Sequence, residues 1–220
     1  MKDIAIYGAG GMGREVACLI RIINESLSND EEKWNLIGFF DDNKEIGARN
    51  EYGVILGGLS ELNAWSKPLS VVIAIATPRI MKKIAEETTN KLIDWPNIIS
   101  PDVVFLDKNN FSIGKGNIIC SRCFISCNIK IGDYNLINEY VTIGHDGTIG
   151  NYNAIMPAVH LSGELTVGNC NFMGVSSVVL QQLKIGNNVT LGASCVIFKN
   201  PKDDCTYIGY NQPLEKKNKN

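Results

Sequence analysis

Aliphatic residues recur at every sixth position from residue 113 to residue 197. A period of 3.6 would indicate a helix and a period of two an ordinary strand, whereas a longer fixed period indicates a stacked repeat. Turn-prone residues follow many of these positions, so the chain is expected to bend after each short strand. The series is Ile113, Ile119, Ile125, Ile131, Ile137, Ile143, Ile149, Ile155, Leu161, Val167, Met173, Val179, Ile185, Leu191 and Ile197.

A second pattern recurs every eighteen residues, which is three of the six-residue periods. Short apolar stretches that end in glycine return at the same phase, for example Ile129–Gly132 and Gly147–Gly150. Three strands per coil therefore predict a triangular prism of five coils, about 24 Å tall if coils stack at the strand spacing of about 4.8 Å. We expect its corners to need positive φ angles, relieved by Gly or Asn. The corner residues in question are Gly114, Gly132, Asp133, Gly150, Asn151, Gly168, Asn169, Gly186 and Asn187.

The first hundred residues lack the six-residue register and instead alternate strand-like with helix-like patterns. This alternation predicts a short Rossmann-like parallel α/β sheet. The expected strands are Ile4–Tyr7, Leu36–Phe40, Val54–Leu56 and Ser70–Ala76. The expected helices are one with Val16, Leu19, Ile20 and Ile23 on one side, one around Leu59–Trp65, and one over Ile80–Thr89.

A glycine-rich turn, with Gly8, Gly10, Gly11 and Gly13, follows the first strand and opens a helix. There, backbone amides and the helix dipole can hold a phosphate, although the same glycines would also suit a tight turn with close packing. Asp41 and Asp42 end the second strand, where they could hold a ribose or base or simply form a polar turn. One hundred residues supply only half of a dinucleotide fold, so a nucleotide site is favoured over an NAD site.

Composition narrows the class of protein and its partners. The 220 residues carry a net charge of −2, with a pI of about 5.7. Apart from the terminal Lys216–Lys219 the sequence has no basic run, which argues against nucleic acid as a partner. The first strand is too short for a signal-peptide core and no apolar stretch approaches a membrane span, so a cytosolic location is expected.

Three of the seven cysteines, Cys120, Cys123 and Cys127, are close enough in sequence to suggest a metal site. They occupy different positions of the six-residue register and should point in different directions. We therefore expect no metal and interpret them as small residues that fill coil positions.

Two histidines, His145 and His160, both lie in the repeat and outside its inward positions. His145 follows Ile143-Gly144 at a corner, beside Asp146. A neutral imidazole there could accept a proton, with the carboxylate fixing its tautomer, or it could be a solvated surface histidine. His160 should face outward from a strand in a structural or interface role.

Several motifs together resemble the bacterial hexapeptide-repeat sugar acetyltransferases that carry an N-terminal nucleotide-sugar-binding domain, a group that includes UDP-4-amino-sugar N-acetyltransferases and sialic acid O-acetyltransferases. The resemblance covers nearly the whole chain. Its carriers are Ile6–Gly13, Gly38–Asp42, Asn97–Pro101, Ile143–Gly150, Leu161–Gly163 and Gly174–Leu180. It implies a nucleotide-sugar domain over residues 1–100, a left-handed β-helix acetyltransferase domain over 101–205 and a tail over 206–220.

The resemblance also implies acetyl-CoA as the acetyl donor and a homotrimer with active sites in the clefts between solenoids. His145 matches the family's general base, Asp146 the acidic residue after it, and Asn138 an active-site asparagine. Gly163 matches the glycine whose amide faces the thioester oxygen. Gly174 and Ala193 match positions along the CoA channel, which Gly163 also borders. The nucleotide-sugar site matches Gly8, Gly10, Gly11, Gly13, Asp41 and Asp42.

The sequence departs from the family pattern at three places. Ala154 stands where some members have a second histidine near the thioester. Ser100-Pro101 replaces the common His-Pro before the solenoid, and the usual Gly-x-Pro ending is spread over Gly209–Pro213.

Three functions are consistent with these features. N-acetylation of a nucleotide-linked amino sugar comes first. O-acetylation of sialic acid or another sugar would use the same base. A non-catalytic solenoid or sugar-nucleotide sensor is the third, although His145 would be dispensable in such a protein.

Overall fold

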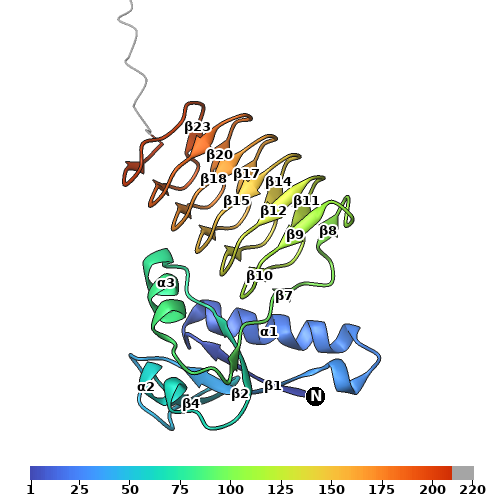
Figure 1. The fold of residues 1–220 in the computed structure, drawn as a ribbon, viewed down its shortest axis with the longest axis vertical. Coiled ribbons are helices and arrows are strands. Elements are labelled where there is room, and N and C mark those ends of the chain that lie inside the picture. Colours follow the sequence, from blue (N-terminus) through green and yellow to red (C-terminus); the bar gives the residue numbers. More distant parts are fainter. Residues whose placement is uncertain (210–220) are drawn as a thin grey trace, which may run out of the picture.

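The computed structural model describes residues 1–209, and it contains an α/β domain joined to a long solenoid (Figure 1). The Gly-x-Pro ending predicted over Gly209–Pro213 and most of the predicted tail lie outside the described residues. Among the described residues, no helix combines the length and the apolar character needed to cross a bilayer. The predicted fold class, a short parallel α/β domain followed by a β-helix, is confirmed.

The N-terminal domain is built on a six-stranded sheet in the order β3-β4-β2-β1-β5-β6, and all neighbours except β3 and β4 are parallel. Its strands are β1 Lys2–Tyr7, β2 Trp34–Phe40, β3 Arg49–Asn50, β4 Gly53–Gly57, β5 Leu69–Ile73 and β6 Ile93–Asp94. Its helices are α1 Gly11–Ser26, the 3₁₀ turn η1 Asp30–Glu32, α2 Leu59–Asn63 and α3 Pro78–Glu87. The alternation read from the sequence therefore reflects a real parallel sheet.

The solenoid has three faces, each a stack of parallel two- or three-residue strands. The seven-stranded face contains β7 Ile98–Ile99, β10 Ile118–Ile119, β13 Leu136–Ile137, β16 Ala154–Ile155, β19 Phe172–Met173, β22 Thr190–Leu191 and β24 Thr206–Tyr207. The six-stranded face contains β8 Val104–Phe105, β11 Phe124–Ile125, β14 Thr142–Ile143, β17 His160–Leu161, β20 Val178–Val179 and β23 Val196–Ile197. The five-stranded face contains β9 Phe111–Ile113, β12 Ile129–Ile131, β15 Thr148–Ile149, β18 Thr166–Val167 and β21 Lys184–Ile185.

The six-residue series forms the interior of this prism. From Ile119 to Ile197 its members are buried to 5% exposure or less, and they pack as one cluster from which water is excluded. Coils cannot bury these side chains singly, so each coil is stabilised by the coils above and below it.

The strand pairing extends beyond the span of the regular series. β7 and β8 already pair with the next coil, but Phe105 and Ile113 lie eight positions apart instead of six. The two extra residues lie in the loop before β9. The strands before this loop, β7 and β8, are therefore shifted by two residues from the six-residue series that begins at Ile113. The predicted domain boundaries, 1–100, 101–205 and 206–220, stay predictions, while paired solenoid strands run from Ile98 to Tyr207.

The prediction that corner glycines relieve positive φ angles is wrong. Positive φ falls one or two positions later, at residues such as Tyr134, Tyr152 and Asn188. Gly132 and Gly150 instead lie against the next coil: a Cβ on Gly150 would meet the carbonyl oxygen of Gly168 at 2.5 Å. Glycine is required there because the coils stack too closely for a side chain.

A buried asparagine ladder supports the corner between the five- and seven-stranded faces. Asn117, Asn135, Asn153 and Asn171 recur every eighteen residues, all at 1% exposure or less. Each Nδ2 from Asn135 onward donates to the Oδ1 of the preceding asparagine at 2.9–3.0 Å and to a glycine carbonyl at 2.9–3.0 Å. Side-chain amides thus satisfy backbone groups that the turn leaves buried.

Replacing Asn135 with alanine should destabilise the solenoid strongly. The change removes the acceptor of Asn153 N and Nδ2 and leaves the carbonyl of Gly150 without its donor. Several unsatisfied buried groups should lower the free energy of unfolding by about 3 kcal/mol or more, which corresponds to a fall in Tm of roughly 5–10 °C. Calorimetry checks this. A Tm within 1–2 °C of wild type, as expected for the exposed control Lys130→Ala, would contradict it.

The N-terminal domain rests on the outer side of the seven-stranded face (Figure 1). The outward residues Ile98, Ile118, Leu136 and Ala154 are part of the same buried cluster as the core of the α/β domain. Phe172 and Tyr152 pack against this cluster, and Tyr152 stacks on Tyr134 with ring centroids 5.4 Å apart. Because Phe172 and Tyr152 are apolar and point outward, the sequence predicts them at a subunit interface. The structure instead packs the chain's own N-terminal domain over them.

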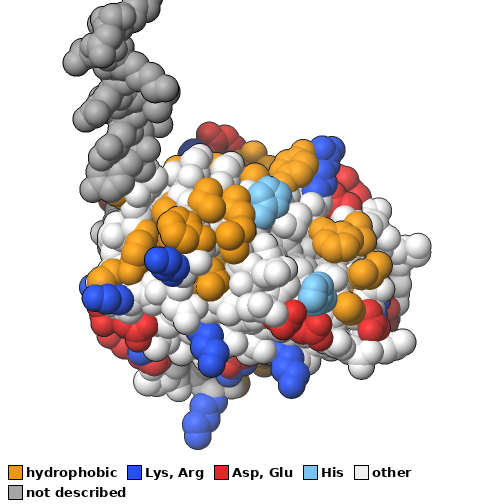
Figure 2. Space-filling model, turned by 90° about the horizontal axis from the view of Figure 1, so that it is seen from above, with side chains coloured by type: hydrophobic (Ala, Val, Ile, Leu, Met, Phe, Trp, Pro, Cys, Tyr) orange, Lys and Arg blue, Asp and Glu red, His pale blue; other side chains and the backbone are white. Residues whose placement is uncertain are grey.

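The outer side of the six-stranded face is apolar and exposed. Val104, Phe124 and Val196 on its strands are 51%, 38% and 51% exposed, and Leu180 and Phe198 beside it are exposed as well. Figure 2 shows apolar side chains gathered near the two histidines. By contrast, the five-stranded face presents Lys130, Thr148, Thr166 and Lys184 to solvent.

Candidate active site

His145 lies in the corner that follows β14 and is half exposed. Its Nδ1 is 2.7 Å from Oδ2 of Asp146, and Asn128 donates its Nδ2–H to the other carboxylate oxygen at 2.8 Å. The hydrogen bonds from His145 and then from Asn128 hold the pKa of Asp146 below its usual value. Because Nδ1 is bound to the carboxylate, Nε2 is the ring nitrogen left to accept a proton.

Gly163 lies directly against the imidazole of His145. A Cβ at position 163 would stand 2.6 Å from Nε2 and 2.8 Å from Cε1. The backbone amide of Gly163 has no hydrogen-bond partner within residues 1–209, as is also true of Gln181 at the equivalent corner. What distinguishes Gly163 is therefore the ring beside it, which places a free amide next to a basic nitrogen.

Asn128 was not identified from the sequence. It stands eighteen residues before Asp146, so the period that defines the coils also predicts that the two side chains stack. The eighteen-residue spacing could have identified Asn128, but no recognisable sequence motif contains this residue.

Replacing Asn128 with alanine should lower kcat about 3- to 10-fold without affecting acetyl-CoA binding. The Asp146 carboxylate would lose one of its two side-chain hydrogen bonds and would hold the imidazole less firmly, a loss of about 1 kcal/mol. Steady-state kinetics at saturating acetyl-CoA measure the effect. Thr148→Ala, an exposed change on the neighbouring strand, serves as the control. Equal kcat for both variants would show that Asn128 does not position the base.

A second group of predicted site residues lies on the other edge of the six-stranded face. Asn138 precedes this face in its coil, whereas His145 follows it. Asn138 is 3% exposed, and its Oδ1 accepts the amide hydrogen of Glu139 at 2.9 Å. Two coils higher, a Cβ on Gly174 would meet the amide nitrogen of Ala193 at 2.7 Å, so the coils stack too closely there for a side chain at position 174. The structure brings His145, Asp146 and Gly163 together and places Asn138, Gly174 and Ala193 apart from them.

Two of the four glycines in the N-terminal turn are explained by packing. Gly8 has φ +107°, and a Cβ there would meet the carbonyl oxygen of Ala74 at 2.8 Å. Gly13 faces the carbonyl of Gly8 across the turn. Added Cβ atoms on Gly10 and Gly11 would meet nothing within 4 Å. The surface at the start of α1 is thus open.

Helix α1 begins without a side-chain cap. The amides of Gly11, Met12 and Gly13 have no partner among the described residues. Together with the dipole of a sixteen-residue helix, they form a site suited to an anionic group.

Asp41 and Asp42 have internal partners. Asp41 accepts the amide of Ala9 at 2.9 Å, which fixes the glycine-rich turn. Asp42 accepts the Tyr7 hydroxyl at 2.6 Å and the amide of Leu59 at 2.9 Å. Burial, and then the hydrogen bond to Asp42, raises the pKa of Tyr7, which stays a neutral donor. Both carboxylates therefore shape the edge of the sheet as well as lining it.

The remaining residues of interest lie outside these groups. Ala154, which the resemblance aligned with a second histidine of some members, is fully buried on the seven-stranded face. His160 is exposed on the six-stranded face, with Nδ1 2.8 Å from the Thr142 hydroxyl oxygen. Cys120 and Cys123 are buried, and burial raises the pKa of both thiols, that of Cys123 to about 12.

Comparison with known proteins agrees with this architecture. Residues 3–88 match the family model of the PglD N-terminal domain. No curated protein matches the chain. Among solved structures, the acetyltransferase domain of PglB from Neisseria gonorrhoeae FA1090 is 26% identical with a TM-score of 0.84, covering 97% of this chain and 100% of that one. A second structure of that domain contains acetyl coenzyme A; it is 26% identical with a TM-score of 0.78, covering 94% and 96%.

Two further structures have the same fold over almost their whole length. WeeI from Acinetobacter baumannii AYE is 26% identical with a TM-score of 0.81, covering 95% of this chain and 97% of that one. PerB from Caulobacter crescentus, in complex with CoA and GDP-perosamine, is 24% identical with a TM-score of 0.80, covering 95% of both. The predicted resemblance to hexapeptide-repeat sugar acetyltransferases with an N-terminal domain is confirmed by these matches.

Proposed function

We propose that this protein is an acetyl-CoA-dependent N-acetyltransferase whose acceptor is an amino group on a nucleotide-linked sugar. The observation that carries the proposal is the corner where Asp146 holds His145 with Nε2 beside the free amide of Gly163. Similarity to an acetyltransferase domain crystallised with acetyl coenzyme A supports the donor. The PglD N-terminal domain and the fold shared with PerB, whose structure holds GDP-perosamine, support the acceptor class.

The mechanism is direct transfer. His145 Nε2 accepts a proton from the amine as its nitrogen attacks the thioester carbon, the carbon–sulfur bond breaks, and CoA leaves as the thiol after taking up a proton. Asp146 keeps Nε2 in the accepting tautomer and stabilises the imidazolium. The amide of Gly163 donates to the thioester oxygen as negative charge develops, a contact worth about 2.7–4 kcal/mol in comparable sites.

The acceptor's nucleotide is assigned to the N-terminal domain. Its phosphates bind at Gly10 and Gly11, where the start of α1 is open, while Gly8 and Gly13 allow the tight turn. Asp41 and Asp42 line the same edge of the sheet and keep its shape. This arrangement supplies one mononucleotide site and no second half for NAD.

The two separated groups of site residues lead to a homotrimer as part of the proposal. Around a threefold axis beside the six-stranded face, the edge with His145 in one copy would meet the edge with Asn138, Gly174 and Ala193 in the next. A cleft between copies would then contain base, oxyanion donor and CoA channel together. The exposed apolar side chains of this face would be buried in the same interface.

Light scattering at micromolar concentration should therefore give a mass of three chains. Phe124→Lys would place a charge in each interface and should dissociate the trimer and abolish activity while leaving the fold intact by circular dichroism. Lys130→Ala, on the five-stranded face, is the control. A monomeric wild-type protein with full activity would contradict the intersubunit site.

Thiol release from acetyl-CoA in the presence of UDP-, dTDP- and GDP-linked amino sugars tests the reaction itself. Acetylation of an amino sugar, identified by mass spectrometry, supports the proposal. Acetylation confined to hydroxyl acceptors would reassign the enzyme to O-transfer.

We place the reaction in the cytoplasm, because all seven cysteines are free thiols, as expected in a reducing compartment.

A further inference from the structure

Helix α3 lies beside the solenoid at the edge between the five- and seven-stranded faces (Figure 1). Three adjoining cavities of about 300, 530 and 270 Å³ lie between the helix and this edge, and Cys170 and Asn188 line all three. We call their combined space the α3 groove. No hydrogen bond or ion pair joins α3 to the solenoid among residues 1–209, so the groove has one wall from each domain.

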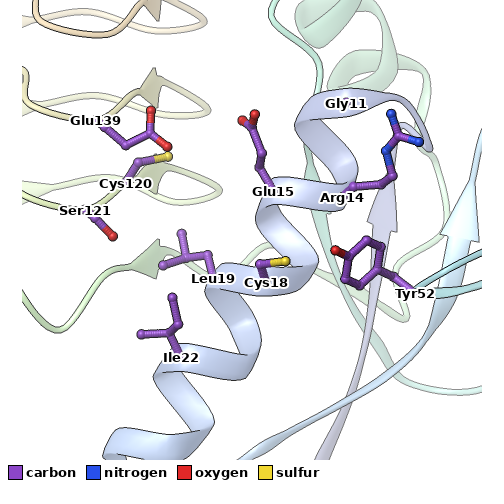
Figure 3. Close-up of a pocket in the computed structure, with 10 residues that line it drawn as sticks. All are labelled: Gly11, Arg14, Glu15, Cys18, Leu19, Ile22, Tyr52, Cys120, Ser121 and Glu139. Carbon is purple, nitrogen blue, oxygen red and sulfur yellow. The ribbon is translucent and has the colours of Figure 1, made fainter.

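The α3 groove is separate from the cavity that runs along α1. This α1 cavity, of about 360 Å³, is lined by Glu15 and Cys18 of the helix and by Glu139 of the solenoid (Figure 3). Glu139 lies at the edge between the seven- and six-stranded faces, directly after the predicted site residue Asn138. The α3 groove lies at the other edge of the seven-stranded face, which is the edge of the prism that carries none of the candidate catalytic residues.

The solenoid wall of the α3 groove presents hydrogen-bond donors whose orientation is fixed. Asn151 Oδ1 accepts the amide hydrogen of Asp133 at 2.7 Å, and Asn187 Oδ1 accepts that of Asn169 at 2.8 Å. Asn151 and Asn187 both line the groove, and neither Nδ2 group has an acceptor among the described residues. Because each side-chain oxygen is already bonded, the amide cannot turn over, and the group that remains for a ligand is the Nδ2 donor.

The helix wall supplies positive charge. Arg79 and Lys82 line the groove, and the Lys82 ammonium is 3.8 Å from the carboxylate of Glu86, one turn further along α3. Arg79 has no carboxylate within salt-bridge distance in the part of the chain that the structure describes. Burial raises the pKa of the Cys170 thiol on the opposite wall, and the charges of Lys82 and Arg79 oppose this shift, so both cations lie near it. The groove therefore combines an uncompensated guanidinium with fixed amide donors.

We propose that the α3 groove is a second ligand site, which binds a small phosphate ester between Arg79 and Lys82 on one wall and Asn151 and Asn187 on the other. A guanidinium whose donors are free matches two phosphate oxygens at once, and the asparagine donors can bond the remaining oxygens. The largest of the three cavities, of about 530 Å³, has the size of a small-molecule site. Bound there, the ligand would join the N-terminal domain to the solenoid without contacting the proposed catalytic residues.

Alkylation of individual cysteines, followed by peptide mass spectrometry, tests this site without depending on enzyme activity. The partly exposed Cys170 reports on the α3 groove and Cys18 on the α1 cavity, while Cys205 lines neither and reports general effects. The probe is ribose 5-phosphate. At ten times its Kd it should slow alkylation of Cys170 about 10-fold, because only the unoccupied fraction of the protein reacts. Alkylation of Cys205 should not change.

Variants of α3 identify the groups that hold the probe. Arg79→Gln and Lys82→Gln each remove one charge at an exposed position, so the fold should be retained, as circular dichroism will check. Each should raise the Kd measured by protection of Cys170 about 10-fold or more, the effect of losing a charge-assisted hydrogen bond. Lys91→Gln, an exposed lysine that does not line the groove, is the matched control and should keep the wild-type Kd.

Saturable protection of Cys170 that weakens in Arg79→Gln and persists in Lys91→Gln supports the inference. Absence of protection in the wild-type protein, or protection of Cys18 alone, would overturn it. Equal protection by potassium chloride at the same ionic strength would mean screening of surface charge, and equal protection by citrate would mean a site for any anion; either result overturns the assignment to a phosphate ester. Unchanged protection in Arg79→Gln would also overturn it. None of these results bears on the proposed acetyl transfer, which the thiol-release assay tests.

Discussion

Replacing His145 with alanine is expected to lower kcat by about 10²–10⁴, the usual contribution of a general base. Nε2 is the group that takes the proton from the amine, and nothing else next to the Gly163 amide offers a basic nitrogen in the described structure. Acetyl-CoA binding should be nearly unchanged, because the imidazole is assigned to the proton of the amine and the CoA channel to Gly174 and Ala193. Single-turnover kinetics and calorimetric titration with acetyl-CoA measure the two quantities separately.

His160→Ala is the control for that experiment. Among the described residues His160 bonds only Thr142, and it lies outside the His145 corner, so its loss should leave kcat within about twofold once the oligomeric state is shown to be unchanged. Wild-type turnover in His145→Ala, together with a large loss in His160→Ala, would move the base to position 160.

The second large effect is expected for Gly163→Ala. The backbone angle at position 163 permits alanine, but the new Cβ would stand 2.6 Å from His145 Nε2 and 3.0 Å from Cδ2. The imidazole must shift by several tenths of an ångström or more, and misplacement of a catalytic group by about 1 Å can lower the rate about 10²-fold. We therefore expect kcat to fall about 10²-fold while the amide donor remains in the chain.

Ser162→Ala, the adjacent position, is the control for this change and should keep most of the activity. Thermal unfolding should show Gly163→Ala to be folded, with a modest loss of Tm at most. Full activity in Gly163→Ala would mean that the His145 imidazole does not lie against this glycine during catalysis.

Two observations about the candidate site could be made from the sequence. The step His145-Asp146 with Ser-Gly eighteen residues after His145 placed three groups at one corner, because one coil contains eighteen residues. The structure adds Asn128, which obeys the same period, and shows the ring of His145 lying on Gly163. Roles for these residues stay predictions until they are tested.

Several features could not be derived because they depend on neighbours that the sequence does not name. The corner glycines are needed for the contact between stacked coils, and the positive φ angles fall on other residues. Phe172 and Tyr152 have the same outward positions whether another subunit or the N-terminal domain covers them. The facing carboxylates Glu15 and Glu139 are 124 positions apart and meet only because α1 lies along the first coils.

The sequence by itself determined the two architectures, because periods of six and eighteen report directly which side chains a coil turns inward, and alternating strand and helix patterns report a parallel sheet. Such periods are local, repeated many times, and independent of what packs outside. The tertiary structure alone decided which of the three faces the N-terminal domain covers, which face stays apolar and exposed, and which groups share the α1 cavity. Those choices follow from burial between segments far apart in the chain, and burial depends on shape as well as on hydrophobicity.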